Sequence, residues 1–366
     1  MKKVKFTNLY KLLKNKSQII KKINFLIKHS KFIGGDEVKN FEKKFAKFTK
    51  SKYCITVANG TDALEIALNS LKLKKGSEVI LPANTWISTA ESIMTNGLKP
   101  IFCDINLDDY SICLKDLKKK ISKRTKAIIA VHLYGNPTNI FEIKKIIKNK
   151  NIKIVEDCAQ AHGTSLGKKH VGTFGDVGTF SFFPGKNLGG FGDGGAIVTK
   201  NRRIWDFCLR ARNHGALKKY DHKFSGRNSR LDTINAAVLN IKLKSYLQVI
   251  KKRNELSKIY FQKFKVIDDI KSFKLDKKNT HSFHQFVIRT KYRNKLATYL
   301  KMNNIQTMVH YPYMLNELKF FNKMKLRNAK NLGKKILSLP ISEEHSKNEI
   351  LYVAEKVQKF FKMLRK

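Results

Sequence analysis

Cysteine is scarce in this sequence, and its spacing suits neither a disulfide framework nor a metal site. Only five cysteines occur in 366 residues, and none belongs to a Cys-x-x-Cys pair or a Cys/His ligand pattern. Disulfide-stapled secreted modules and zinc-binding modules are therefore excluded, and we expect no metal. Unpaired cysteines fit a reducing compartment, so the expected location is cytoplasmic. The five are Cys54, Cys103, Cys113, Cys158 and Cys208.

Long apolar runs are also missing. The chain begins MKKVKF without an apolar signal segment behind it, and no stretch approaches the roughly 20 apolar residues that cross a membrane. We therefore expect neither export nor membrane insertion. Residues 8–32 place leucine and isoleucine at helical spacing among lysines, as in a basic amphipathic helix. Such a helix can lie on a membrane, but packing against the body of the protein is commoner.

Acidic residues are few: 28 stand against 75 lysines and arginines, for a formal net charge of +47. That charge alone would suggest a polyanion such as nucleic acid. Only 12 of the basic residues are arginine, however, and the lysines are spread from Lys2 to Lys366 without a dominant block. Nucleic-acid interfaces favour arginine and clustered patches, so we interpret the lysines as filling solvated positions and expect no nucleic-acid partner. The positive field would still attract an anionic cofactor or a nucleotide-linked substrate.

Apolar residues are plentiful where a core requires them. With 42% hydrophobic residues, the chain is too apolar to be disordered and long enough for two domains. Between about residues 53 and 210, short runs rich in Ile and Val alternate with helical patterns. Runs without polar alternation indicate strands covered on both faces, hence a mostly parallel seven-stranded sheet between helices, an α/β fold. The runs are residues 53–58, 78–82, 100–105, 127–135, 152–157, 179–183 and 196–199.

The pattern changes after Arg230. Residues 231–264 form one long helical pattern without glycine or proline, and fewer strands alternate with helices beyond it. We predict a large domain over residues 1–240, including the N-terminal helical segment, and a smaller C-terminal α/β domain over residues 241–366. The later apolar stretches are 282–290 and 305–312, and the later helical ones lie near 292–303 and 346–363.

Two stretches at strand ends are candidates for a ligand site. Gly60, between Asn59 and Thr61, would let backbone amides face an anion at a helix start, although an ordinary helix cap would look the same. The run IVED ends a buried strand on Asp157, where ligands lie in open α/β sheets. A structural acid paired with a lysine is the alternative there. An aspartate under a protonated ring nitrogen is also what pyridoxal phosphate chemistry requires.

Lys186 differs from the other lysines in its surroundings. It stands in FSFFPGKNLGGFGDGG (180–195), after an apolar strand and among glycines that permit close backbone approach. A lysine nucleophile must be partly desolvated to be neutral and to form an imine. The neighbouring phenylalanines could provide that desolvation.

These stretches together resemble the DegT/DnrJ/EryC1/StrS family of pyridoxal phosphate-dependent nucleotide-sugar aminotransferases, which have the aspartate aminotransferase fold (fold type I). The likeness covers nearly the whole chain, from FIGGDEVKNFEKKFAKF (32–48) to VHYPYML (309–315). Six ordered motifs carry it: NGTDALEIAL, ILPANTWISTAESI, VHLYGNP, VEDCAQAHG, SFFPGKNLGGFGDGGAIVT and GRNSRLDTINAAVL.

The resemblance assigns the residues around the cofactor ring. It implies that Lys186 carries pyridoxal 5'-phosphate covalently and shuttles the proton. It further implies that Asp157 pairs with the ring nitrogen, that Gln160 lies near the ring hydroxyl, and that Trp86 stacks on the ring face.

The resemblance also assigns the cofactor phosphate. It implies that Gly60, Thr61 and Ser181 hold the phosphate, and that Asn228 reaches the phosphate of the neighbouring subunit. The working unit would then be a homodimer with shared active sites.

The substrate side is less determined. His162 could face the substrate or be a structural histidine; His310 and Tyr311 resemble a substrate loop, although a packing turn would look the same. Arg230 is a further substrate candidate. The family often has Gln where Asn235 stands, which leaves the substrate open.

The resemblance implies a transaminase that uses glutamate as amino donor and a nucleotide-linked keto sugar as acceptor. The segments around Lys186 and Asn228 look closer to branches that aminate a 3-keto sugar than a 4-keto sugar. Dehydratase relatives replace the lysine with histidine, so Lys186 favours transamination. Two alternatives stay open: a cysteine desulfurase-like enzyme, and a regulatory or nucleic-acid-binding protein on a vestigial aminotransferase fold.

Overall fold

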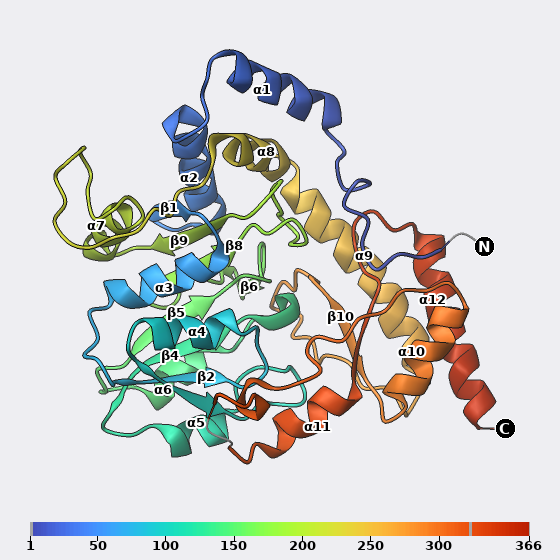
Figure 1. Ribbon diagram of the computed structural model, residues 1–366. Helices are drawn as coiled ribbons and strands as arrows, with labels where there is room; N and C mark the ends of the chain where they lie inside the picture. Colours follow the sequence, from blue (N-terminus) through green and yellow to red (C-terminus); the bar gives the residue numbers. More distant parts are fainter. Residues whose placement is uncertain (1–2, 322–323, 366) are drawn as a thin grey trace.

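A seven-stranded sheet forms the centre of the large domain in the computed structural model, which describes residues 3–321 and 324–365 (Figure 1). Its strand order is β1-β9-β8-β5-β4-β2-β3. Neighbours from β3 to β8 pair in parallel, whereas β9 pairs antiparallel with β8 and β1. The expected seven strands and mostly parallel sheet are confirmed. The strands are β1 (Tyr53–Val57), β2 (Glu78–Pro82), β3 (Lys99–Cys103), β4 (Thr125–Val131), β5 (Lys153–Asp157), β8 (Val177–Ser181) and β9 (Gly195–Thr199).

Helices cover both faces of this sheet, which is why its strands are apolar throughout. In β2, Val79 and Leu81 pack into one core while Ile80 packs into another on the opposite face. One face is covered by α3 (Gly60–Ser70), α4 (Ser88–Thr95) and α7 (Arg202–Ala211). The other is covered by α2 (Gly35–Thr49), α5 (Leu114–Lys120), α6 (Ile140–Ile146) and α8 (Thr233–Leu243). Short elements complete the domain: η1 (Leu133–Gly135), β6 (Ser165–Leu166) and β7 (Lys169–His170).

The single long helix expected over residues 231–264 is wrong, because two helices occupy this range. After α8 the chain turns at Lys244 and Ser245, and α9 (Tyr246–Phe264) begins. The turn lets the two helices pack in different domains: α8 packs on α2 in the large domain, and α9 packs on α12 in the small one.

The small domain contains β10 (Phe286–Arg289), α10 (Arg293–Met302), η2 (Leu315–Glu317), α11 (Arg327–Lys335), β11 (Ile336–Leu339) and α12 (Lys347–Leu364).

The N-terminal residues join the two domains. Val4 packs into the small-domain core and forms a β-bridge with Ile305. The helix that follows, α1 (Lys16–Lys28), packs on α8 through Ile19. Val4 therefore packs with the small domain and α1 with the large one, and the division of the chain at residue 240 stays a prediction. Within the described residues, none of the helices is both long and apolar enough to cross a membrane.

Candidate active site

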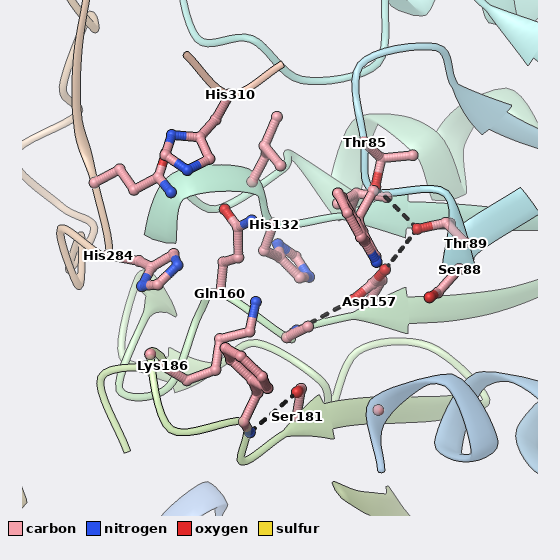
Figure 2. Close-up of a pocket in the computed structure, with 18 of the residues that line it drawn as sticks. Thr85, Ser88, Thr89, His132, Asp157, Gln160, Ser181, Lys186, His284 and His310 are labelled. Carbon is pink, nitrogen blue, oxygen red and sulfur yellow. Dashed lines mark hydrogen bonds between the residues drawn. The ribbon is translucent and has the colours of Figure 1, made fainter. Parts of the chain in front are cut away.

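A cavity of about 620 Å³ opens at the carboxyl ends of the parallel strands (Figure 2). Ligands bind at this edge in open α/β sheets, and here the small domain supplies the opposite wall. Nine of the residues assigned from the sequence line this cavity: Gly60, Thr61, Trp86, Asp157, Gln160, Ser181, Lys186, His310 and Tyr311.

The amino end of α3 faces the cavity and suits an anion. Asn59 caps the helix, and its side chain accepts a first-turn backbone N–H at 2.8 Å. Gly60 lies so close to β8 that a Cβ on it would be 2.7 Å from the Cβ of Ser181, which requires glycine. Thr61 and Ser181 add hydroxyl groups. Free amides at the positive end of a helix, with hydroxyls beside them, can hold a phosphate.

Asp157 ends β5 at the floor of the cavity and is nearly buried. Thr89 donates a hydrogen bond to Oδ2 at 2.9 Å, and the backbone N–H of Ala159 donates to Oδ1 at 3.1 Å. Burial raises the pKa of Asp157, while these two hydrogen bonds and the charge of Lys186 act against that rise. The carboxylate is thus fixed in orientation and available to a positively charged group above it.

Lys186 reaches into the cavity from the loop between β8 and β9 (Figure 2). Burial lowers its pKa from 10.5 to about 8, and the charge of Asp157 partly opposes this shift. A lysine in this state supplies neutral amine near physiological pH, as imine formation with a carbonyl group requires.

Asn235 holds the loop that carries Lys186. Its side chain accepts the Phe191 N–H at 2.9 Å and donates to the Asp193 carbonyl oxygen at 2.7 Å. A Cβ on Gly190 would collide with the Asn235 side chain, so the close approach depends on glycine. The asparagine that departs from the family pattern therefore supports the lysine loop.

Gln160 links the floor of the cavity to the small-domain loop. Its Oε1 accepts the Tyr134 N–H at 2.7 Å, and its Nε2 donates to the Tyr311 hydroxyl at 3.1 Å. Trp86 and Tyr311 lie together at the cavity wall, with ring centroids 5.6 Å apart. Burial raises the pKa of Tyr311, so its hydroxyl stays protonated. The two rings are tilted by 43° to one another and form an aromatic part of the wall beside Gln160.

Two histidines line the small-domain wall. His310 lies 2.9 Å from the Ser338 hydroxyl through Nδ1, and burial together with the Lys186 charge lowers its pKa to about 4. His284 was missed from the sequence, although a lone histidine inside the apolar stretch 282–290 was the available signal. Phe183, one of the phenylalanines expected around Lys186, lines the cavity. The sequence reasoning also missed other lining residues: Phe6, Thr7, Leu9, Thr85, Ser88, Thr89, His132, Asp193, Arg253, Gln285 and Met308.

A buried hydrogen bond between His132 and Glu156 supports the end of β5 next to Asp157. His132 Nε2 lies 3.0 Å from a carboxylate oxygen of Glu156, and its Nδ1 accepts the Thr138 N–H at 3.0 Å. Glu156 accepts three further backbone N–H groups, from Gly172, Phe174 and Gly175. Cys158 lies close enough for the three side chains to resemble a metal site. Protein groups already use both histidine nitrogens and the carboxylate, so the arrangement is a structural support.

The expectation that His162 faces the substrate is wrong for this chain. His162 is fully buried among Phe45, Phe180, Phe182 and Tyr246, and it does not line the cavity. Burial lowers its pKa to about 3. Within the described residues, neither ring nitrogen has a hydrogen-bond partner. The alternative interpretation, a structural histidine, fits this position.

Two other candidates lie outside the cavity of their own chain. Asn228 is exposed, and Arg230 is half-buried with its Nε enclosed and unpaired among the described residues. Between them, the Ser229 hydroxyl accepts the Ala58 N–H at 3.1 Å and ties this segment to the end of β1. The predicted substrate contact of Arg230 is therefore not formed within one chain. The role of Asn228 across a subunit boundary stays a prediction.

A cavity lysine next to a buried aspartate, at the sheet edge of this two-domain α/β fold, defines a pyridoxal phosphate-dependent transferase of fold type I. The profile described as the DegT/DnrJ/EryC1/StrS aminotransferase family matches residues 14–358, and the chain belongs to this family. It is an aminotransferase, and pyridoxal phosphate is the cofactor of its family.

Three similar proteins show the range of the family. An Aneurinibacillus thermoaerophilus protein named dTDP-3-amino-3,6-dideoxy-α-D-galactopyranose transaminase is 38% identical, covering 95% of this chain and 96% of the relative. A Geobacillus stearothermophilus protein named pleiotropic regulatory protein is 36% identical, covering 95% of each chain. The solved structure of S. venezuelae DesV, in complex with a ketimine intermediate, is 30% identical, covers 99% of each chain and has a TM-score of 0.96.

Proposed function

We propose that this aminotransferase moves an amino group from glutamate to the ketone of a nucleotide-linked keto sugar, with the 3-keto position preferred over the 4-keto position. The observation that carries the proposal is the meeting of Lys186, Asp157 and the positive end of α3 in one cavity. The relative named as a dTDP-3-amino sugar transaminase supports the substrate class and the 3-position.

The residues of the cavity fit pyridoxal phosphate. The phosphate would lie at Gly60, Thr61 and Ser181, which come together because a glycine at position 60 lets the start of α3 approach Ser181 closely. Asp157 would face the ring nitrogen, and Trp86 would cover the ring. When bound, the cofactor supplies an electron sink for negative charge on the carbon next to the amino nitrogen.

Lys186 has two tasks in this proposal. Its neutral amine, favoured by the lowered pKa of about 8, would hold the cofactor covalently at its carbonyl carbon, with water as the leaving group. Nζ of Lys186 would also be the group that moves the proton at the carbon bearing the amino nitrogen. The negative charge of Asp157 would stay in a fixed position opposite the ring nitrogen during the reaction, because Thr89 donates a hydrogen bond to its carboxylate.

We further propose a homodimer with shared active sites. Three large aromatic side chains at or near the cavity are half exposed in one chain: Trp86 (56%), Phe183 (54%) and Phe191 (46%). Apolar surface of this kind at a cavity suits a covering partner. Asn228 is exposed and outside its own cavity, as a residue that serves the neighbouring subunit would be.

The two alternative functions have weaker support. A desulfurase needs a mobile, reactive cysteine; here four of the five free cysteines are buried and Cys113 is half-buried. Free cysteines also fit the proposed cytoplasmic location. The relative named pleiotropic regulatory protein is the observation that favours a regulatory role. Lys186 and Asp157, which line one cavity, support catalysis instead, since a purely regulatory protein has no need of a low-pKa lysine in a cavity with a buried carboxylate.

The test is a substrate panel. The holoenzyme with glutamate is offered dTDP-, UDP- and GDP-linked 3-keto and 4-keto sugars, and the amino sugar is detected by mass spectrometry. We expect turnover with at least one 3-keto sugar at a kcat/KM above that for any 4-keto sugar. Turnover confined to 4-keto sugars would overturn the regiochemistry, and no turnover with any nucleotide sugar would overturn the substrate class.

A further inference from the structure

His284 is not among the residues proposed to hold the cofactor, and its ring lines the cavity wall on the same side as Lys186 (Figure 2). It lies just before β10, in a segment that the small domain contributes. The ring is half-buried, so part of it remains open to the cavity. A ring in this position can contact the substrate.

The neighbour of Lys186 determines which nitrogen of His284 carries the proton. Asn187 is buried, and its Nδ2 donates a hydrogen bond to the Ser282 carbonyl oxygen at 2.9 Å. Its Oδ1 therefore faces His284, whose Nδ1 lies 3.0 Å away. An amide oxygen can only accept, so Nδ1 is the donor and carries the proton. Nε2 is then an unprotonated acceptor.

The ring stays neutral in this place. Burial lowers the pKa of His284 well below 6.5, and the charges of Lys186 and Arg253 lower it further. No group among the described residues bonds to Nε2, and the atom is not among those enclosed without a partner. A neutral acceptor, fixed in orientation and open to the cavity, is available for a donor on the substrate.

We propose that His284 positions the sugar by accepting, through Nε2, a hydrogen bond from a hydroxyl on a carbon next to the reacting carbon. This inference rests on the proposed function. Lys186 must reach the reacting carbon, and His284 lies beside Lys186, so the hydroxyl within its reach is one that flanks that carbon. Glutamate carboxylates carry no proton at neutral pH and cannot donate to Nε2. The contact therefore serves the sugar half-reaction and not the glutamate half-reaction.

The test measures the two half-reactions separately on the pyridoxal phosphate form of the enzyme. Glutamate and dTDP-3-amino-3,6-dideoxy-α-D-galactopyranose each convert the cofactor to its amine form, and the same absorbance change reports both. The variants are His284→Phe, which keeps a flat ring without an acceptor, and His284→Gln, whose amide oxygen can accept. His29→Phe, at an exposed position just after α1, is the matched control.

We expect His284→Phe to lower kcat/KM for the amino sugar by about 5- to 50-fold, the usual effect of losing one buried hydrogen bond, and to change the glutamate reaction by less than about twofold. His284→Gln should recover part of the loss. The hydroxyl that His284 binds is missing from one of two analogues of the amino sugar, the 2-deoxy or the 4-deoxy compound. With that analogue, His284→Phe should not lower kcat/KM further.

Equal losses in both half-reactions, no loss with the sugar, or a penalty that persists with both deoxy analogues would each overturn the role of His284. A wild-type enzyme that reacts with glutamate but not with the amino sugar would instead count against the proposed substrate. Wild-type activity together with an unaffected His284→Phe variant counts only against the histidine.

Discussion

Thr89 donates its hydroxyl proton to Oδ2 of Asp157 over 2.9 Å, and the Thr85 hydroxyl lies 2.9 Å from that of Thr89. Thr89 belongs to α4 and Asp157 to β5, so the contact joins two elements at the floor of the cavity. With the Ala159 N–H on the other oxygen, it fixes the plane of the carboxylate. The orientation of the group proposed to face the cofactor ring thus depends on a threonine that has no direct catalytic task.

Replacing Thr89 by valine should weaken cofactor binding. The substitution preserves shape and removes the donor, so the pKa of Asp157 should rise further and its ion pair with a ring nitrogen should weaken. We expect the Kd for pyridoxal phosphate, measured by titrating the apo-enzyme, to rise by about 3- to 10-fold, as for a net hydrogen bond. Thr95→Val, on an exposed position of the same helix, is the control. An unchanged Kd would show that Thr89 does not support Asp157.

Attachment of pyridoxal phosphate to the apo-enzyme should depend on pH through Lys186. Because its pKa is lowered to about 8, the neutral amine becomes the major form above that pH and is lost below it. The rate constant of attachment should rise by about tenfold per pH unit below 8 and level off above it. Stopped-flow absorbance between pH 6 and 10, with Nα-acetyl-lysine as reference, measures the profile. A rate still rising steeply at pH 10 would contradict the lowered pKa.

Replacing Lys186 by alanine should abolish transamination and covalent attachment. Borohydride reduction of wild-type holoenzyme should place the cofactor mass on the peptide that contains Lys186, and Lys186→Ala should lack the adduct. Lys200→Ala, at an exposed lysine just after β9, should retain both the adduct and activity. Full activity of the Lys186→Ala protein would refute the mechanism.

Shared sites predict complementation between two inactive variants. In a mixed dimer of Lys186→Ala and Asn228→Ala chains, one of the two sites receives an intact Lys186 from one chain and an intact Asn228 from the other. Random mixing of equal amounts should restore about a quarter of wild-type sites. Activity is measured after joint refolding, with each variant refolded alone as control. An Asn228→Ala protein that is fully active by itself would argue against sharing.

Replacing His162 by phenylalanine should leave catalysis intact. Both ring nitrogens lack partners among the described residues, and four aromatic side chains surround the ring. Exchanging an unsatisfied buried polar group for an apolar one of similar shape is near neutral or stabilising. We expect an unchanged or higher Tm and half-reaction rates within about twofold of wild type. A selective loss in the sugar half-reaction would reinstate His162 as a substrate residue.

The large domain could be predicted from sequence because its strands are covered on both faces. A strand such as β4 must be apolar at successive positions, with Ile128 and Ile129 entering opposite cores, so it appears as a continuous run. Lys186 and Asp157 were recognisable for a related reason. Asp157 is the last residue of β5, and Lys186 stands in the loop that follows β8, so both lie at the sheet edge where ligands bind.

The small-domain wall and the direction of single side chains were not predictable in this way. Met308 forms a β-bridge with Ser338 in β11, and the sequence pattern around either residue does not predict this pairing. His284 lines the cavity while His162 is fully buried, although both stand beside apolar residues in the sequence. Which way a histidine faces depends on packing partners far along the chain, such as Tyr246 for His162. A single sequence does not show which distant residues these packing partners are.

The N-terminal segment has a consequence for the order of biosynthesis. Val4 bridges to Ile305, the Phe6 N–H binds the Gln306 side chain at 3.1 Å, and Phe6 contributes to the cavity wall. Translation runs from the amino end, so Val4 and Phe6 are made before the strands of the sheet, whereas Ile305 and Gln306 are made after them. A nascent chain can therefore assemble the sheet and present Lys186 while one side of its cavity stays open, until residues 305–311 have been made. The complete cavity depends on two segments that lie 300 residues apart in the sequence.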